Sequence, residues 1–571
     1  MLNIANEGAD PRHRAGGRAV SITVEHLSKS TRDGHVILDD ISLAVAPGEL
    51  VAIVGGSGAG KTTLLEAMAG VRPAMSGHVR FDGADLYENL GLFRTVLGYV
   101  PQDDIIHADL PLQRTLRYAA GLRLTGASPA EIEHAVCSAM AALDLTPRAG
   151  TRVAALSGGQ RKRASIAVEL LTEPHVFFLD EPTSGLDPAT GAELMRVLRR
   201  LAHGGATVVL TTHAVQDLGV CDKVVFLAQG SLAFAGTLPD ALAYFGANSP
   251  EEIYERLAAE PGGKAWAERF AQARGPATEE ALQAEPPSAP RRTRAGPFRQ
   301  WRVLTERSFE TMVRNRLTLA ILLGSPALVV AMFAVLFRPG AFRFADPSPG
   351  TIVMILFWVA FGAFFFGLTY GLLQICTELP IVRREQLVGL RLGAYLVSKI
   401  TVLLPFLVGV GVLMLVVLRA LDRLPAAPLH VYASIGVTLA LDAAAALALG
   451  ILTSAAVGHP SQATLALPML CFPAVLFSGA ILPVHVMASV GAAISAVMPD
   501  RWAFEAIGHD LGVRGLLAHG GSPLGPPLIA TFGSAGTHST VTYWLYLVAF
   551  VVGFLVASRV ALGWACRRQS R

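Results

Sequence analysis

Charged residues are scarce in this sequence of 571 residues. Asp, Glu, Lys and Arg make up 16% of it, hydrophobic residues make up 52%, and the mean hydropathy is +0.47. An average soluble domain has about 25% charged residues, so we expect part of this chain to lie in lipid. The net charge of +3 is small, and no Lys- and Arg-rich face interleaved with aromatic residues occurs, which gives no indication of a nucleic-acid partner.

Cysteine is also rare, and its spacing excludes two classes of protein. The five cysteines are Cys137, Cys221, Cys376, Cys471 and Cys566. They are scattered, with no C-x-x-C pair and no spacing typical of metal ligands. A disulfide framework and a zinc site are therefore not expected, and a reduced, cytosolic environment fits.

The first 19 residues lack the apolar core of a signal peptide. They are polar and include Arg12, Arg14 and Arg18, so nothing in them directs cleavage or secretion. We predict a disordered leader over residues 1–19.

The rest of the chain changes character near residue 245. Residues 20–245 alternate short apolar runs with polar segments, and VAIVG (51–55), VFFLD (176–180) and TVVLTT (207–212) are typical of buried parallel strands. Because the chain is too long for one core, we predict a multidomain protein. Its first domain, residues 20–245, is expected to be an α/β layer fold.

A different composition follows this domain. Residues 246–297 are rich in Ala, Glu, Pro and Arg and end in EPPSAPRRTRAGP, which predicts a linker. Residues 298–316 mix aromatics with arginines, and Leu304, Phe309 and Met312 could form one apolar stripe of a helix. We predict a connecting helix at the membrane interface; the alternative is an ordinary amphipathic helix of a further soluble domain.

Six apolar segments then approach or exceed the ~20 residues that cross a bilayer. They lie at residues 317–337, 351–373, 395–418, 429–454, 463–482 and 541–564. We predict an all-α transmembrane domain of six helices over residues 317–571, whose even number of spans places both ends on one side. Arginines such as Arg383 and Arg391 flank the ends expected to be cytoplasmic, although Arg338 and Arg419 fall on the other side.

A glycine-rich segment in the first domain indicates phosphate binding. GGSGAGKT (55–62) fits the pattern G-x-x-x-x-G-K-S/T between a predicted strand and a predicted helix. Its glycines would let backbone N–H groups cradle phosphate oxygens at the positive end of the helix. Lys61 would reach the β- and γ-phosphates, and Thr62 would bind Mg²⁺. The residues expected to contact ATP here are Gly55, Ser57, Gly58, Gly60, Lys61, Thr62 and Thr63.

A carboxylate element complements this P-loop. In VFFLDE, a strand-like run ends at Asp180, which would lie near Mg²⁺. Glu181 follows at a position where it could polarise the attacking water. An apolar strand followed by an acidic residue is common, so this element alone is weak evidence for a nucleotide site.

LSGGQ (156–160) is the decisive motif. With it, the sequence resembles the ATP-binding cassette (ABC) family, whose ATPase domains carry this signature between a P-loop and the carboxylate strand. The resemblance implies that the start of a helix here binds the γ-phosphate held by the P-loop of an opposite domain. The implied residues are Ser157, Gly158, Gly159 and Gln160.

Further residues match elements of the same family. Gln102 matches the glutamine that senses Mg²⁺ and faces the membrane domain, and His213 matches the histidine that contacts the γ-phosphate, although each alone would be an ordinary turn or core residue. SGLD (184–187) matches the loop that crosses the dimer interface. Where the family has an aromatic residue against adenine, this chain has KSTRDGHV; either Arg32 or His35 replaces the ring, or adenine is held loosely.

The resemblance thus implies catalytic roles for some residues and metal contacts for others. The catalytic pair is Glu181 and His213. The metal contacts are Thr62, Gln102 and Asp180. The implied cofactors are ATP and Mg²⁺.

The order of the domains narrows the family. A nucleotide-binding domain ahead of the membrane domain is typical of the pigment and multidrug (G) subfamily and its bacterial relatives, which residues 98–124, 156–187 and 379–400 resemble. This implies an ATPase that exports or flips a lipid or amphiphile. Its expected location is the bacterial cytoplasmic membrane, with the nucleotide-binding domain and both termini in the cytoplasm.

The expected assembly is a dimer of half-transporters. One chain supplies one P-loop and one signature, so a second copy or a related half-transporter is needed, with membrane lipid around both. The alternative is a membrane-anchored ABC ATPase that does mechanical or regulatory work on a partner without moving a substrate.

Three segments of the membrane half leave alternatives open. Residues 378–391 would form the family's cytoplasmic coupling helix, or else a plain loop, and residues 483–540 either re-enter the membrane or lie at its outer surface. Asp442 lies within the fourth apolar segment, where an ionised carboxylate costs about 2.5 to 3.5 kcal/mol. It is either a substrate-path or proton-linked group, or a hydrogen-bonded packing residue.

Overall fold

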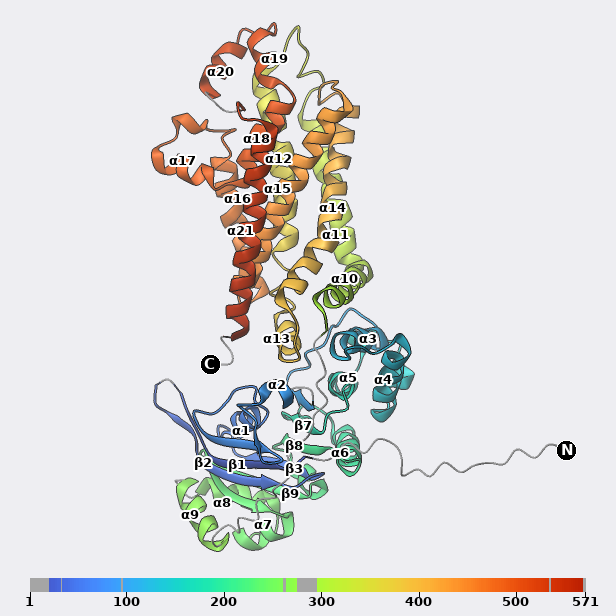
Figure 1. The fold of residues 1–571 in the computed structure, drawn as a ribbon, viewed down its shortest axis with the longest axis vertical. Coiled ribbons are helices and arrows are strands. Elements are labelled where there is room, and N and C mark those ends of the chain that lie inside the picture. The colour runs from blue at the N-terminus through green and yellow to red at the C-terminus, as the bar shows by residue number, and fades with distance from the viewer. Residues whose placement is uncertain are drawn as a thin grey trace, which may run out of the picture. The chain divides into compact units, whose positions relative to one another are not determined.

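The computed structural model describes residues 20–31, 33–93, 96–259, 263–274, 295–532 and 536–567. They form two compact units, one made almost entirely of residues up to 295 and one of residues from 296 onwards (Figure 1). The predicted leader and Arg32 lie outside the described residues.

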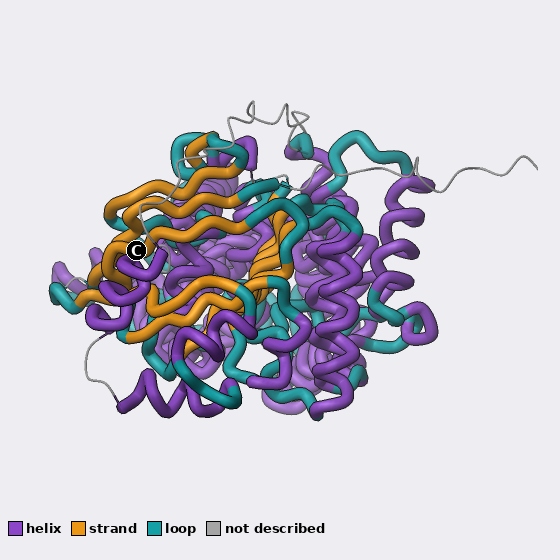
Figure 2. The backbone as a smooth tube through the Cα atoms, turned by 90° about the horizontal axis from the view of Figure 1, so that it is seen from below, coloured by secondary structure: helices purple, strands orange, loops and turns teal. Residues whose placement is uncertain are grey.

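The first unit is an α/β domain, and its described strands form two sheets (Figure 2). The antiparallel sheet has the order β2-β1-β4-β5, with β1 (Ile22–Ser30), β2 (Val36–Val45), β4 (Ser76–Phe81) and β5 (Ala84–Asp85). The second sheet has the order β10-β9-β3-β8-β7-β6, with β3 (Leu50–Gly55), β6 (Leu97–Val100), β7 (Val176–Leu179), β8 (Thr207–Thr211), β9 (Lys223–Ala228) and β10 (Ser231–Gly236). Its strands are parallel except β10.

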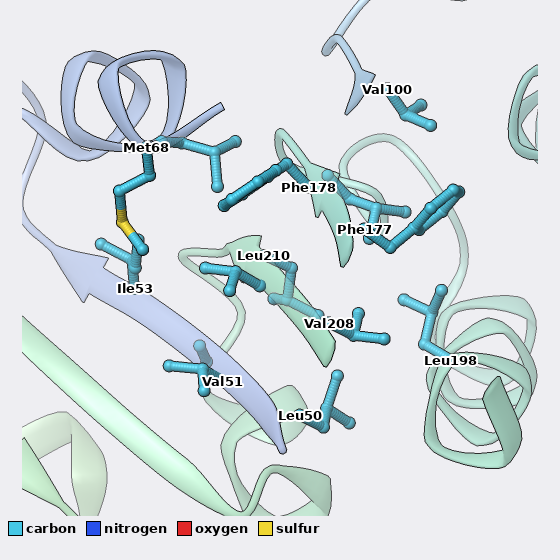
Figure 3. Close-up of a cluster of buried hydrophobic side chains, with 14 of the residues drawn as sticks. Leu50, Val51, Ile53, Met68, Val100, Phe177, Phe178, Leu198, Val208 and Leu210 are labelled. Carbon is cyan, nitrogen blue, oxygen red and sulfur yellow. The ribbon is translucent and has the colours of Figure 1, made fainter. Parts of the chain in front are cut away.

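The three strands predicted from sequence lie at the centre of the second sheet. Every residue of β3, β7 and β8 is buried, as expected for parallel strands covered on both faces. Because successive side chains point to opposite faces, Phe178 lies on the side of Met68 in α1 (Lys61–Met68), while Phe177 lies on the side of Leu198 in α6 (Pro188–His203) (Figure 3). The predicted α/β fold class is confirmed.

The remaining helices of the unit surround this sheet. They are α2 (Leu90–Phe93), α3 (Leu112–Arg123), α4 (Pro129–Ala142), α5 (Gly158–Leu170), α7 (Leu238–Phe245), α8 (Pro250–Ala259) and α9 (Gly263–Arg274). A buried ion pair joins α3 to α5, with the Arg123 guanidinium donating to both Glu169 carboxylate oxygens at 2.7 and 2.8 Å. Both ends of this pair are satisfied, as a buried charge requires.

The linker predicted over residues 246–297 is corrected in its first half. Residues in this range form α8 and α9, and α9 packs on β10. Ile253, Trp266 and Phe270 are buried there, so a few anchoring side chains outweigh a composition rich in Ala and Glu. Residues 275–294 lie outside the described residues.

The second unit is helical. Its helices are α10 (Pro297–Arg314), α11 (Arg316–Leu336), α12 (Pro349–Gly371), α13 (Leu379–Leu387), α14 (Leu392–Ala420), α15 (Leu429–Ala456), α16 (Pro460–Phe477), α17 (Ser489–Ala496), α18 (Pro499–Asp510), α19 (Val513–His519), α20 (Gly525–Phe532) and α21 (Thr540–Arg567). The six predicted spans correspond to α11, α12, α14, α15, α16 and α21. Among the described residues, five of these helices are long and apolar enough to cross a membrane, while α11 contributes a shorter apolar helix over Leu322–Phe333.

Helices α12 and α15 approach each other closely because glycine lines their contact. A Cβ atom on Gly367 would lie 2.4 Å from the Ala443 carbonyl oxygen, and one on Gly371 would lie 2.6 Å from that of Leu447. Small residues allow such backbone approach between membrane helices. The long connection at 483–540 forms the short helices α17 to α20, and α18 packs against α12, α15 and α21.

The packed face of the predicted connecting helix differs from the expected one. α10 buries Gln300, Leu304 and Arg307, whereas Phe309 is 56% exposed. Polar contacts explain the choice: the Gln300 side chain accepts a hydrogen bond from the Arg391 N–H at 2.8 Å, and Arg307 pairs with Glu385 of α13. A face chosen by hydrophobicity alone misses such pairs.

Candidate functional site in the first unit

The glycine-rich loop joins β3 to α1, and two of its glycines are required by the backbone. Gly55 has φ 152° and Gly60 has φ 96°, values that disfavour side chains. A Cβ on Gly55 would lie 2.4 Å from the Leu227 carbonyl oxygen, and one on Gly60 would lie 2.9 Å from that of Ile37. Ser57 and Gly58 are exposed on the loop, and Thr63 is half-buried in the first turn of α1. The first N–H groups of a helix have no partner within the helix, so those of α1 are available to an anion held by the loop.

Lys61 folds back over this loop. Its Nζ donates hydrogen bonds to the carbonyl oxygens of Gly55 at 2.9 Å and Gly56 at 3.0 Å. Burial lowers the pKa of Lys61 from the ordinary lysine value, while the charges of Glu181 and Asp180 act in the opposite direction. The ammonium group therefore stands at the loop with carboxylates nearby, positioned for an anion.

Asp180 follows β7 and is held by two hydroxyl groups. Its Oδ1 accepts hydrogen bonds from Thr62 Oγ1 at 3.0 Å and from Thr211 Oγ1 at 2.6 Å. Mg²⁺ prefers one or two carboxylates together with phosphate oxygens. The adjacent hydroxyl of Thr62 and carboxylate of Asp180 are hard oxygen donors, so these residues fit the ion.

Glu181 gathers two other predicted residues around its carboxylate. Gln102 Nε2 donates to Glu181 Oε2 at 3.1 Å, and His213 Nδ1 lies 3.5 Å from Oε1. The backbone of Glu181 has φ 45°, an uncommon conformation for a residue with a side chain and one that is concentrated at functional sites. Its N–H donates to Thr211 Oγ1 at 2.9 Å. A carboxylate held in this way can accept a proton from a bound water.

Three supporting residues were not predicted from the sequence. Thr211 holds both Asp180 and Glu181, and Lys162 donates to the Gln102 carbonyl oxygen at 2.5 Å. Asp217 accepts hydrogen bonds from Thr183 at 2.6 Å and Thr212 at 2.9 Å. The parallel register, which pairs Leu179 with Leu210, places the next residues, 180 and 211, side by side. This pairing of residues 180 and 211 can be predicted only when the order of the strands is known.

The signature segment begins α5. Ser157 caps the helix: its Oγ accepts from the Gln160 N–H at 3.3 Å, and the Gln160 side chain accepts from the Ser157 N–H at 3.2 Å. Ser157 and Gly158 are exposed, while a Cβ on the buried Gly159 would lie 2.5 Å from Thr190 Cγ2. Within the described part of the chain, no hydrogen bond joins this segment to the P-loop.

The structure also describes the SGLD loop and His35, the other elements predicted from the sequence. Residues 184–187 lead into α6, where the Asp187 carboxylate accepts the Thr190 N–H at 3.0 Å as helix cap. His35 is exposed in the turn between β1 and β2, where its N–H donates to Thr31 Oγ1 at 3.1 Å. The Arg32 alternative lies outside the described residues.

Family models match both units. The ABC transporter model matches residues 38–184, and the ABC-2 type transporter model matches residues 299–508. Together they assign a nucleotide-binding cassette to the first unit and a membrane domain to the second. The predicted order of the two domains is confirmed.

Curated relatives agree with this assignment. The chain is 32% identical over 555 residues to the ABC transporter ATP-binding/permease protein Rv1747 of Mycobacterium tuberculosis, covering 94% of this chain and 62% of that protein. It is 37% identical over 232 residues to ABC transporter G family member 21 of Arabidopsis thaliana, covering 38% of this chain and 34% of that protein. The chain thus spans less than two thirds of these relatives. Its first unit is an ABC-type nucleotide-binding cassette, and its second unit is an ABC-2 type membrane domain.

Proposed function

We propose that this chain is one half of an ATP-driven transporter that works as a dimer. The observation that carries the proposal is the carboxylate of Glu181, held by Gln102 and facing His213, beside the Asp180 and Thr62 pair. This set combines a proton acceptor with groups that can hold a metal-bound phosphate chain. It occurs in a chain whose second domain is a membrane domain of transport type.

The proposed chemistry is hydrolysis of ATP. The P-loop N–H groups and Lys61 would hold the phosphates, and Thr62, Asp180 and Gln102 would hold Mg²⁺, which would supply positive charge beside them. Glu181 takes a proton from water as the water oxygen attacks the γ-phosphorus. The bond from phosphorus to the ADP oxygen breaks, and the proton leaves with phosphate to solvent. His213 would hold the γ-phosphate next to Glu181.

The dimer is proposed because one chain has one P-loop and one signature, and no hydrogen bond joins the two among the described residues. Ser157 and Gly158 are exposed, and the free N–H groups at the start of α5 are suited to an anion. In the proposed dimer, each signature covers the nucleotide bound to the partner's P-loop, with SGLD at the interface. The partner is a second copy or a related half-transporter.

A complementation experiment tests this arrangement. Lys61→Ala destroys the P-loop and Ser157→Arg blocks the signature, so either homodimer has no complete site. A mixed dimer of the two variants retains one complete site, formed by the P-loop of one chain and the signature of the other. We expect it to recover up to about half of the wild-type ATPase rate. Mixed dimers that are as inactive as either parent would contradict the proposal.

A substitution at Thr211 tests the support of the carboxylates. Thr211→Val leaves the Glu181 N–H without its partner, which costs about 1–3 kcal/mol. ATP hydrolysis should therefore slow by about one to two orders of magnitude. Thr207→Val is the matched control, because Thr207 is a buried threonine of the same strand whose hydroxyl contacts Val20 and Gly48 instead. Equal loss of turnover per folded molecule in both variants would contradict the role of Thr211.

The transported substrate is proposed to be a lipid or amphiphile, with the nucleotide-binding domain and both termini in the bacterial cytoplasm. Reconstituted vesicles test this part, with fluorescent lipids of different head groups as probes. ATP-dependent movement that is lost in Lys61→Ala supports transport. ATPase activity without movement, stimulated only by a partner protein, supports a membrane-anchored ATPase instead.

A further inference from the structure

Two carboxyl groups are buried together in the helical unit. Asp442 of α15 is 0% exposed and Asp500 of α18 is 1% exposed. None of their four carboxyl oxygens has a hydrogen-bond partner in the structure. Helices α15 and α18 pack against each other (Figure 1), and the charge of Asp500 acts on Asp442. Such oxygens normally have partners, so this pair requires an explanation.

No cation among the described residues compensates the pair. The ionisable groups on the helices around it include Tyr370 of α12, Tyr395, Lys399 and Arg419 of α14, His430 and Tyr432 of α15, Cys471 of α16, Arg501, Glu505, His509 and Asp510 of α18, and Tyr543, Tyr546, Arg559, Cys566 and Arg567 of α21. Lys399 pairs with Glu378 at 2.7 Å, and Arg501 pairs with Glu505 at 3.0 Å. Tyr543 donates to Glu505 at 3.3 Å. Lys399 and Arg501 are therefore engaged elsewhere.

Two carboxylates that are buried without a compensating cation cannot both be ionised. Burial without a partner strongly disfavours an ionised carboxylate, and a second negative charge nearby disfavours it further. The inexpensive solution is to bind hydrogen ions, since a protonated carboxyl is neutral.

We propose that Asp442 and Asp500 form a proton-binding site inside the membrane domain, in which Asp500 is the group that exchanges its proton. Asp500 lies in the first turn of α18, where the helix dipole favours a negative charge. Asp442 lies in the middle of α15, where no such end is available. The site goes beyond the proposed ATPase and does not depend on it.

The strength of proton binding at Asp500 fits exchange near neutral pH. Burial raises the pKa of Asp500 to about 8, although nearby backbone N–H groups act in the opposite direction. Asp500 lies in α18, outside the helices that qualify as membrane spans. Release of its proton leaves a buried carboxylate that only backbone N–H groups of the first turn support. It should therefore favour a conformation in which this carboxylate is hydrated, which would link protonation to the state of the membrane domain.

Carbodiimide labelling of the full-length protein in lipid nanodiscs tests the site. Dicyclohexylcarbodiimide is apolar and adds to protonated carboxyl groups, and mass spectrometry of the digested protein locates the adduct. We expect Asp500 to be labelled below a pH of about 8 and labelling to fall about tenfold for each further pH unit. Asp442 should remain labelled at higher pH. Asp510 is the internal control, because its carboxylate accepts hydrogen bonds from Ser434 and Thr540 and should stay unlabelled.

A substitution tests whether the two carboxyl groups interact or titrate independently. Asp500→Asn removes the neighbouring negative charge, so the labelling curve of Asp442 should move to lower pH. Infrared difference spectra provide a measurement that needs no reagent access: the protonated carboxyl band should diminish in Asp442→Asn. Absence of both the label and the band would overturn the proposal, as would an Asp442 curve that Asp500→Asn does not move.

Discussion

Replacing Glu181 with Gln is expected to lower the rate of ATP hydrolysis about 100- to 10,000-fold, the usual contribution of a general base. The amide has the shape of the carboxylate and its oxygen can still accept the hydrogen bond from Gln102, now at 3.1 Å from Glu181 Oε2. It cannot accept a proton from water. Nucleotide should therefore bind and remain, and the two cassettes should stay associated. Phosphate release and retention of labelled ATP on purified protein measure the two effects.

Glu173→Gln is the matched control for this prediction. Glu173 has φ 48°, close to the 45° of Glu181, but it lies exposed after α5 and away from the P-loop. The same change of charge at Glu173 should leave the hydrolysis rate within about twofold, the usual effect of a surface substitution. If Glu181→Gln retained wild-type turnover, or bound no ATP while folded, the proposed role of Glu181 would be wrong.

The local part of the nucleotide site could be predicted because its residues lie in short continuous segments of the sequence. A P-loop needs a strand, glycines, a lysine and a helix in sequence, and GGSGAGKT supplies them between β3 and α1. Asp180 and Glu181 follow a wholly buried strand for the same reason. Thr211 and Asp217 could not be chosen from single segments, because their roles depend on which strands are neighbours.

Pairs of residues that are distant in sequence but close in the fold could not be predicted from the sequence. The sequence marks Asp442 as a lone charge in an apolar segment, but its relation to Asp500 depends on the packing of α15 on α18. Average composition predicts a linker at residues 246–297 because it hides Trp266 and Phe270 within a polar background. The average composition of a segment indicates how polar it is, whereas a few individual apolar side chains decide whether the segment packs on the domain.

The same distinction applies to the ion pair that holds α10 to α13. Arg307 and Glu385 form two hydrogen bonds, one of them 3.1 Å from Nη2 to Oε2, and their side chains are 4% and 11% exposed. Glu385→Ala leaves the guanidinium buried without its partner, which should cost about 3–5 kcal/mol of folding free energy. A clear fall in the thermal unfolding midpoint of the detergent-solubilised protein would show this loss.

Another Arg–Glu pair on α10 provides the control, because its side chains are exposed. Arg302 and Glu306 lie 3.0 Å apart, with side chains 71% and 53% exposed. Glu306→Ala should cost about 0.5 kcal/mol or less, as is usual for exposed pairs four residues apart. Since Arg307 and Glu385 join α10 to α13 within the membrane domain, Glu385→Ala should also loosen the segment proposed to couple ATP hydrolysis to transport. Equal midpoints for the two variants would mean that burial does not decide the strength of this contact. The proposed coupling segment would then need another anchor.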